Sequence, residues 1–260
     1  MKKILRKILY IFFPRLTKGA SILMYHSVAK NKAFFTVSPE DFEKQMEYLS
    51  RSGFKIIPIY LLLDMFFRKE DLSSFVSVTF DDGYLDNLEN ALPILRKYNI
   101  KATIFIAPKL LGSKFTTSDG VTLDIFSQED FKKYDGFTNF EFLPHSFSHK
   151  ELTRLSVEEI REELSESINY LNNISESRKI LAYPRGKYSK DVIEVLMSER
   201  WESGVTTLPG LLMTDTEKFL IPRNFVGAGV GLSEFKTIVS DAVYYYAKIR
   251  LCFTDLFKKS

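Results

Sequence analysis

Short apolar runs alternate with longer amphipathic stretches along most of this chain, and this alternation constrains its fold more than any other feature. The runs that we predict to be strands are Ser21–Tyr25, Lys55–Pro58, Phe75–Phe80, Ala102–Ala107, Phe140–Leu143, Lys179–Tyr183, Gly204–Thr207 and Pro222–Val226. The stretches that we predict to be helices are Pro39–Arg51, Ile59–Arg68, Asn87–Tyr98, Val157–Asn173, Lys190–Glu199 and Leu232–Ala247. Repeated strand–helix units are typical of a mainly parallel sheet covered by helices, so we expect an α/β fold.

One long polar stretch interrupts this rhythm after the fourth predicted strand. It runs from Gly112 to Gly136, is rich in Ser, Thr and Asp, and shows helical periodicity only at Gln128–Tyr134. An excursion of this length after a strand is typical of an active-site lid. A surface loop without function is the alternative.

The composition agrees with a single large globular domain. The chain has 260 residues, of which 45% are hydrophobic and 27% charged, enough for a well-buried interior. Its single cysteine, Cys252, excludes an internal disulfide. The net charge of +3 is too small to suggest nucleic-acid binding. We expect the main domain to span residues 21–240.

The two ends differ from this domain because basic and apolar residues are mixed in both. Residues 1–20 form a predicted basic amphipathic segment, and residues 241–260 a basic-aromatic tail. The uninterrupted apolar run Ile8–Phe13 is too short to cross a bilayer and lacks a signal-peptide cleavage site. Either the ends contact a membrane surface or they pack as peripheral helices on the domain. We therefore expect a cytoplasmic or peripherally membrane-associated protein.

Two adjacent carboxylates, Asp81 and Asp82, follow the predicted strand Phe75–Phe80 and precede Gly83. Strand ends of this kind open onto the crevice where α/β folds place their chemistry. One aspartate could bind a metal ion while the other accepts a proton. An ordinary turn is the alternative reading of Asp-Asp-Gly after an apolar run.

All three histidines of the chain lie at predicted strand ends or in the loops that follow. His145 and His149 are four residues apart, a spacing that can bring two imidazoles to one ion. The alternative for this pair is two surface or capping histidines. His26 follows the strand Ser21–Tyr25 and, taken alone, is more typical of a structural histidine.

Three motifs in the same order resemble those of the polysaccharide deacetylase family, also called the NodB-homology family or carbohydrate esterase family 4. Thr79–Gly83 matches Thr-Phe-Asp-Asp-Gly, and His145–His149 matches His-Ser/Thr-x-x-His. Ala182–Ser189 is similar to a motif that often reads Tyr-Pro-Tyr-Gly. Leu23–Val28 resembles the start of a subgroup that acts on poly-N-acetylglucosamine. The resemblance implies a distorted (β/α) barrel of about seven strands.

The resemblance also implies a role for each residue of the predicted site. Asp82, His145 and His149 would hold a divalent metal, commonly zinc, with cobalt or nickel as alternatives. Asp81 would be the general base. Most members of the family take their general acid from a later histidine, and no histidine follows His149 here. The resemblance to the subgroup with the early Tyr-His sequence therefore implies that His26 is the general acid.

Five further residues are expected at the substrate or around the catalytic groups. They are Tyr84, Tyr183, Pro184, Arg185 and Arg223. Arg185 replaces the usual motif tyrosine, so it either narrows the groove, binds an anionic group or points outward. Arg223 matches an arginine common in the subgroup; it either orients Asp81 or the acid, or forms a structural salt bridge.

These observations predict a metal-dependent hydrolase that removes N-acetyl groups from amino sugars of a surface polysaccharide or its lipid-linked precursor. The alternatives are a deformylase or deacetylase of a lipid-linked monosaccharide, a peptidoglycan or chitin-oligomer deacetylase, and an inactive glycan-binding scaffold. Two histidines and a carboxylate also occur in non-haem iron oxygenases. That reading is disfavoured here because those sites keep one histidine and the carboxylate close in sequence, on an all-β fold.

Overall fold

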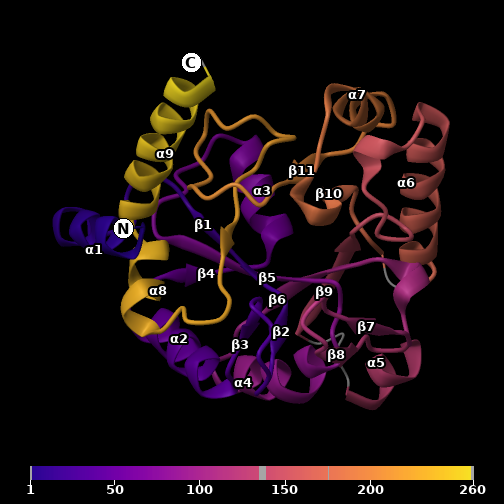
Figure 1. Cartoon of the computed structure of the whole chain (residues 1–260), viewed down its shortest axis with the longest axis horizontal. Helices are drawn as coiled ribbons and strands as arrows, with labels where there is room; N and C mark the ends of the chain where they lie inside the picture. The colour runs from indigo at the N-terminus through magenta and orange to yellow at the C-terminus, as the bar shows by residue number, and fades with distance from the viewer. Residues whose placement is uncertain (1, 135–138, 175, 259–260) are drawn as a thin grey trace.

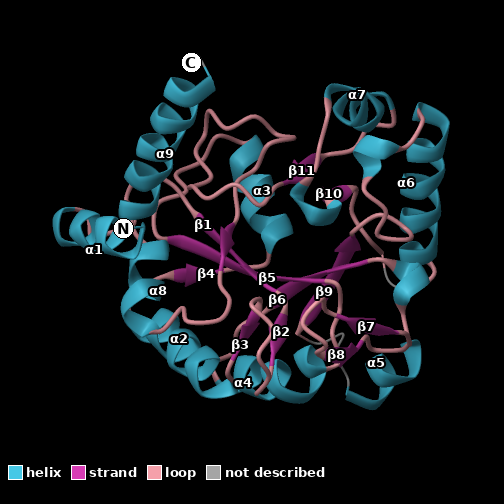
Figure 2. Cartoon of the chain, in the orientation of Figure 1, coloured by secondary structure: helices cyan, strands magenta, loops and turns pink. Residues whose placement is uncertain are grey.

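A parallel sheet of six strands forms the centre of the protein, whose computed structural model describes residues 2–134, 139–174 and 176–258. Five strands follow one another across the sheet in the order β12 (Asn224–Phe225), β1 (Ser21–Tyr25), β5 (Phe75–Asp81), β6 (Ala102–Ile106) and β9 (Phe140–Pro144). The sixth, β4 (Lys55–Ile56), pairs with the start of β5. Every pairing in this sheet is parallel, as Figures 1 and 2 allow the reader to follow.

Three shorter pairs of strands complete the β-structure of the described residues. β10 (Ile180–Ala182) and β11 (Ser203–Val205) form a parallel pair beside β9. β2 (Ser27–Val28) and β3 (Thr36–Val37) form a second parallel pair, and β7 (Lys114–Thr116) and β8 (Thr122–Asp124) an antiparallel one. The expected α/β fold with a parallel central sheet is confirmed, and a strand lies at each of the eight predicted positions.

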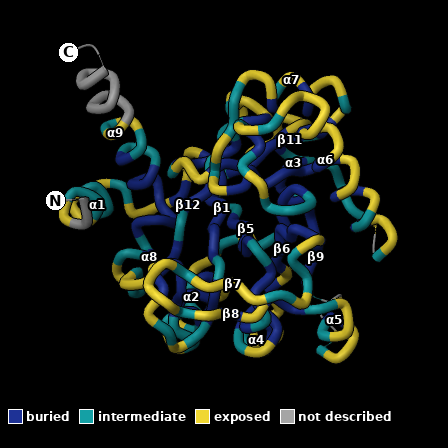
Figure 3. The backbone as a smooth tube through the Cα atoms, turned by 45° about the vertical axis from the view of Figure 1, so that its right-hand side comes forward, coloured by how far each residue is buried: buried dark blue, intermediate teal, exposed yellow. Residues whose placement is uncertain are grey.

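The helices cover the sheet, and their exposed faces form the surface while β1, β5, β6 and β9 lie largely buried inside (Figure 3). They are α2 (Pro39–Arg51), α3 (Ile59–Phe67), α4 (Leu92–Lys97), α6 (Val157–Asn172) and α7 (Lys190–Ser198). A π-helical turn, Asn87–Ala91, leads into α4. Serine side chains accept hydrogen bonds from backbone N–H groups at the starts of α2 and α6, which explains why these helices begin where the sequence predicts.

Side chains of the central strands alternate between two apolar clusters, because successive residues of a strand point to opposite faces. Val78 and Phe80 of β5 lie in the larger cluster, which includes residues of α2 and α4. Ile22 of β1 and Phe105 of β6 lie in the second cluster, with residues of α3, β10 and β11. The sheet and the β10–β11 pair therefore enclose a common interior, although their backbone ladders are separate in the described residues.

One predicted helix is wrong in its extent. Leu232–Ala247 is not continuous; it consists of α8 (Leu232–Ile238) and the start of α9 (Ala242–Lys258). The break occurs at Asp241, whose carboxylate accepts hydrogen bonds from the N–H groups of Thr17 and Lys18 and from the Thr17 hydroxyl. These partners lie more than 200 residues away in sequence, so the local pattern did not reveal the break.

The polar excursion and the two ends also take up regular structure. The excursion contains the β7–β8 hairpin and α5 (Gln128–Tyr134); its last residues, 135 and 136, lie outside the described residues. α1 (Lys2–Phe12) packs against α8 and α9 at one edge of the molecule (Figure 1). None of the helices in the described part of the chain has the length and apolar character needed to cross a bilayer. The predicted domain limits at residues 20 and 240 stay predictions.

Candidate active site

The carboxylates and histidines singled out in the sequence lie at the same edge of the sheet. Asp81 is the last residue of β5, His26 follows β1, and His145 follows β9. Because β1, β5, β6 and β9 are adjacent and parallel, their carboxyl ends share this edge. All of these residues, with Asp82 and His149, line a pocket of about 470 Å³. The fold therefore brings together residues that are up to 123 positions apart in sequence, from His26 to His149.

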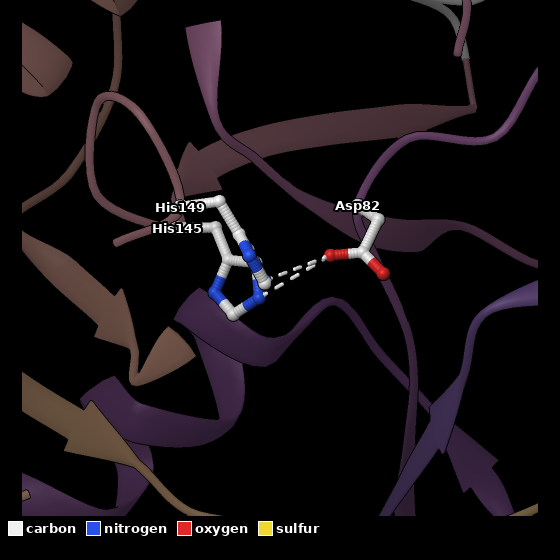
Figure 4. Close-up of side chains that lie close together, drawn as sticks. All are labelled: Asp82, His145 and His149. Carbon is white, nitrogen blue, oxygen red and sulfur yellow. Dashed lines mark ion pairs between the residues drawn. The ribbon is translucent and has the colours of Figure 1, made fainter. Parts of the chain in front are cut away.

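Asp82, His145 and His149 form a compact group of candidate metal ligands. Their ligand atoms all lie within 4.8 Å of one another. Asp82 Oδ1 is 3.2 Å from His149 Nε2 and 3.6 Å from His145 Nε2. Figure 4 shows both imidazole rings next to this carboxylate. The ring of His145 donates from Nδ1 to the carbonyl of Ala182 at 2.7 Å, which leaves Nε2 with a free lone pair toward Asp82. This arrangement fits a divalent cation with nitrogen and oxygen ligands.

The protonation of these groups suits cation binding. Burial lowers the pKa of His145 to about 4, so that ring is neutral and able to act as a ligand at neutral pH. Burial alone would raise the pKa of Asp82, but its hydrogen bond to His149 and the nearby histidines hold it well below its usual value. Burial would likewise lower the pKa of His149, but the hydrogen bond and charge of Asp82 raise it. A cation and a proton would therefore compete for His149.

The backbone takes uncommon conformations at the candidate ligands. Asp82, Ser146 and His149 have φ angles of 71°, 58° and 59°. Residues other than glycine avoid this left-handed region, and such strain is concentrated at functional sites. Gly83 also has a positive φ, and an added Cβ would lie 2.8 Å from the ring of Phe126. The motif glycine is therefore required for both its conformation and its small size.

Glu163 of α6 holds the loop that joins the two ligand histidines. Its carboxylate accepts hydrogen bonds from the N–H groups of Phe147 and Ser148 at 3.1 and 2.8 Å, and a short one from the Ser148 hydroxyl. Our sequence reasoning did not identify this residue. A signal for it exists, since Glu163 stands between Ile160 and Leu164 on the apolar face of a predicted amphipathic helix.

Asp81 forms a buried bidentate ion pair with Arg223. Nη1 and Nη2 of the guanidinium lie 2.6 and 2.7 Å from the two carboxylate oxygens of Asp81. Arg223 is fully buried and also donates to the carbonyl of Thr206 and the hydroxyl of Thr79. Burial would raise the pKa of Asp81, but the charge of Arg223 lowers it, so Asp81 is ionised at neutral pH. This ion pair fits both alternatives for Arg223, orientation of Asp81 and a structural salt bridge, so its role stays a prediction.

His26 lies on the wall of the same pocket, between aromatic rings. Its ring centroid is 5.6 Å from that of Phe35 and 6.0 Å from that of Phe225. Two residues that we did not predict fix its loop. Asn87 donates to the carbonyl of His26, and Asp86 accepts from the N–H of Val28 and the hydroxyl of Ser27. The catalytic role of His26 stays a prediction.

The remaining predicted site residues take different positions. Tyr84, Tyr183 and Arg185 line the pocket; Pro184 is buried beside it. The hydroxyl of Tyr183 donates to the carbonyl of Phe219, which gives this side chain a structural contact. Burial and the neighbouring Asp82 raise the pKa of Tyr84, so its hydroxyl keeps its proton. Arg185 is exposed at the rim, with a φ of 57°.

The β7–β8 hairpin of the polar excursion borders the pocket. Phe115, Ser118 and Ile125 line it, and Ile125 forms a bridge with Tyr84 of the first motif. Phe115 also packs near Phe35, with ring centroids 6.5 Å apart. The excursion is therefore part of the wall of the site, as a lid would be, and its movement stays a prediction.

Comparison with known proteins agrees with this geometry. Residues 68–199, about half of the chain, match the family described as "Polysaccharide deacetylase". The chain belongs to the polysaccharide deacetylase family. This assignment confirms the resemblance seen in the three motifs, and with it the expectation that the protein is an enzyme of this family.

Individual relatives extend the match over most of the chain. The Bacillus subtilis (strain 168) protein YxkH, assigned to the polysaccharide deacetylases, is 30% identical over 216 residues, which are 82% of this chain and 74% of the relative. Poly-beta-1,6-N-acetyl-D-glucosamine N-deacetylase of Staphylococcus aureus is 27% identical over 214 residues, covering 78% of this chain and 72% of that protein.

Solved structures show the same fold. Streptococcus pyogenes deacetylase PplD, in complex with acetate, superposes with a TM-score of 0.73 at 22% identity, covering 85% of this chain and 97% of that one. IcaB from Ammonifex degensii gives a TM-score of 0.72 at 20% identity, with 85% and 97% covered. At these identities the likeness concerns the fold alone.

Proposed function

We propose that this protein is a zinc-dependent N-deacetylase that hydrolyses the acetamido group of an amino sugar within a surface polysaccharide or its lipid-linked precursor. The observation that carries the proposal is the convergence of Asp82, His145 and His149, with ligand atoms within 4.8 Å, in the lining of a pocket that also contains Asp81. Cobalt or nickel could occupy the same ligands.

A divalent ion held by these three residues would supply an acidified water molecule and polarise the amide carbonyl. Hydrolysis needs two further groups from the chain itself. Asp81 is ionised and oriented by Arg223, so it can accept the proton of the attacking water. His26, on the wall of the same pocket, is proposed to donate the proton that the leaving amine requires.

The relatives and the aromatic lining of the pocket support this substrate class. One relative is named as a poly-beta-1,6-N-acetyl-D-glucosamine N-deacetylase, so a polymer of N-acetylglucosamine is the first substrate to test. Phe34 and Phe115 expose apolar ring surface at the pocket mouth, 73% and 42% of each residue. Exposed aromatic faces of this kind can pack against the apolar faces of sugar rings.

The test combines metal analysis with acetate release. The purified protein, loaded with zinc or cobalt, is incubated with polymeric, oligomeric and lipid-linked N-acetyl sugars, and free acetate is measured. Asp82→Ala, His145→Ala and His149→Ala should each lose the ion and the activity. Asp71→Ala, which removes an exposed carboxylate, is the control and should retain both.

Asp81→Asn separates the proposed base from the proposed ligands. It should keep the ion and lose about 10²–10⁴ in turnover, the usual cost of removing a general base. Wild-type metal content in all three ligand variants would contradict the site. If acetate were released only from a lipid-linked monosaccharide, or only from peptidoglycan or chitin oligomers, that compound would replace the proposed polysaccharide as the substrate. Glycan binding without acetate release in the loaded wild type would indicate an inactive scaffold.

A further inference from the structure

The first helix, α1, presents a continuous apolar stripe to solvent. Ile4, Ile8, Ile11 and Phe12 lie on one face at helical spacing and are 64%, 47%, 73% and 71% exposed. They are four of the eleven large apolar side chains that are exposed in the described residues, although the helix has only 11 residues. Single exposed apolar residues are common, but a contiguous exposed stripe is typical of a site that binds another protein or a membrane.

The stripe cannot turn inward, because the opposite face of α1 is attached to the body. Arg6 forms an ion pair with Glu234 of α8 at 3.1 Å, and its guanidinium lies 4.4 Å from the ring centroid of Tyr246 in α9. Just after the helix, the ring of Phe13 stacks on Tyr245 with centroids 3.9 Å apart. These contacts fix the rotation of α1 with its apolar stripe outward.

The charged residues in the segment of the sequence that carries the stripe are all basic. The chain contains no acidic residue before Glu40, whereas Lys2, Lys3, Arg6, Lys7, Arg15 and Lys18 fall within its first 18 residues. Lys7, Arg15 and Lys18 are exposed. Two acidic groups that contact this segment are engaged with it: Glu234 pairs with Arg6, and Asp241 accepts hydrogen bonds from Thr17 and Lys18.

We propose that α1 is a membrane-docking helix that inserts its apolar stripe into the interface of an anionic lipid surface. Isoleucine and phenylalanine on one face with lysine beside them are the composition of helices that lie in the plane of a bilayer interface. The basic flanks complement anionic headgroups. A second copy of the chain is a poorer partner, because a symmetric contact would place the same basic residues against one another.

Co-sedimentation of the full chain with lipid vesicles tests this proposal. The wild type should bind vesicles of mixed phosphatidylglycerol and phosphatidylcholine, bind phosphatidylcholine alone more weakly, and dissociate from the anionic vesicles as salt is raised. Ile11→Asp/Phe12→Asp should weaken the apparent affinity at least about tenfold, because two charges replace the apolar stripe. Lys7→Gln should weaken it about fivefold on anionic vesicles only.

A matched control separates the stripe from the added charge. Val157→Asp/Met197→Asp changes the net charge equally at two apolar positions on α6 and α7 that are 39% and 58% exposed. It should bind vesicles like the wild type. Failure of the wild type to bind anionic vesicles, or equal losses in the two double variants, would overturn the proposal. The proposal would also be overturned if the wild type were a dimer and Ile11→Asp/Phe12→Asp made it a monomer without changing vesicle binding. The stripe would then be a protein interface.

Discussion

The ion pair between Arg223 and Asp81 allows the energetics of the site to be tested separately from catalysis. The perturbation is Arg223→Met, which keeps an apolar side chain of similar length but removes the guanidinium. Asp81 would then be a buried carboxylate that has lost two charge-assisted hydrogen bonds, of 2.6 and 2.7 Å. Each hydrogen bond to a charged group contributes about 1.5–3 kcal/mol, and removing one partner of a buried ion pair typically costs about 3–5 kcal/mol.

We therefore expect Arg223→Met to lower the free energy of unfolding by about 3–5 kcal/mol in urea denaturation at neutral pH. The control is Arg161→Met, which breaks an ion pair with Glu199 in which both side chains are more than 40% exposed. An exposed pair contributes only about 0–1 kcal/mol, so this variant should stay close to the wild type.

The double variant Asp81→Asn/Arg223→Met completes the test. It should recover much of the stability lost in Arg223→Met, because no unpaired charge remains buried. The reasoning is refuted if Arg223→Met costs no more than Arg161→Met, or if the double variant is less stable than the sum of its single changes predicts. Either result would mean that Asp81 finds another partner or is neutral in the fold.

Three further predictions concern the acid, the ligand loop and the partly buried Glu141. His26→Ala should lower turnover on an N-acetyl sugar by about 10²–10⁴ but affect an activated aryl acetate much less, since that leaving group hardly needs a proton; equal losses in both assays would exclude a general-acid role. Glu163→Gln should weaken zinc binding, measured by calorimetric titration, by about 10–100-fold because it removes the negative charge and one of the two accepting oxygens that hold the loop between the histidines; unchanged affinity would show that the loop is held without them. Burial raises the pKa of Glu141 to about 7 from its ordinary 4.5, so the folded state binds this proton more tightly than the unfolded chain does. The resulting contribution to the free energy of unfolding is fully present below pH 4.5 and is lost as the pH rises through 7. Glu141→Gln should therefore gain up to about 3 kcal/mol over the wild type between roughly pH 5 and pH 8 in urea denaturation, and an equal pH dependence of both proteins would contradict this.

The element order could be predicted because local periodicity carries it. Each predicted strand is a short apolar run, and most of the apolar side chains of β1, β5, β6 and β9 lie in the two clusters on either side of the sheet. His26, Asp81 and His145 could be placed together because each lies at the end of one of these runs, and adjacent parallel strands have their carboxyl ends at one edge of the sheet. The metal-ligand candidates were thus found from the position of motifs relative to strands, without any contact being known.

Other features depend on contacts that no local pattern contains. Arg223 meets Asp81 across 142 residues of sequence, and Asp241, in the break of the predicted final helix, accepts hydrogen bonds from Thr17 and Lys18. The role of Glu163 also depends on such a contact. Its place on the apolar face of a helix can be explained only when the loop that it binds is known.

The N-terminal helix shows the division between sequence and structure most clearly. Its sequence determined that α1 would be amphipathic and basic, because spacing and residue type are local properties. Whether its apolar residues pack inward or face solvent was decided by the tertiary structure, through the contacts of Arg6 with Glu234 and Tyr246. The physical reason is that helix periodicity defines faces relative to one another, whereas the orientation of a face requires a partner elsewhere in the chain.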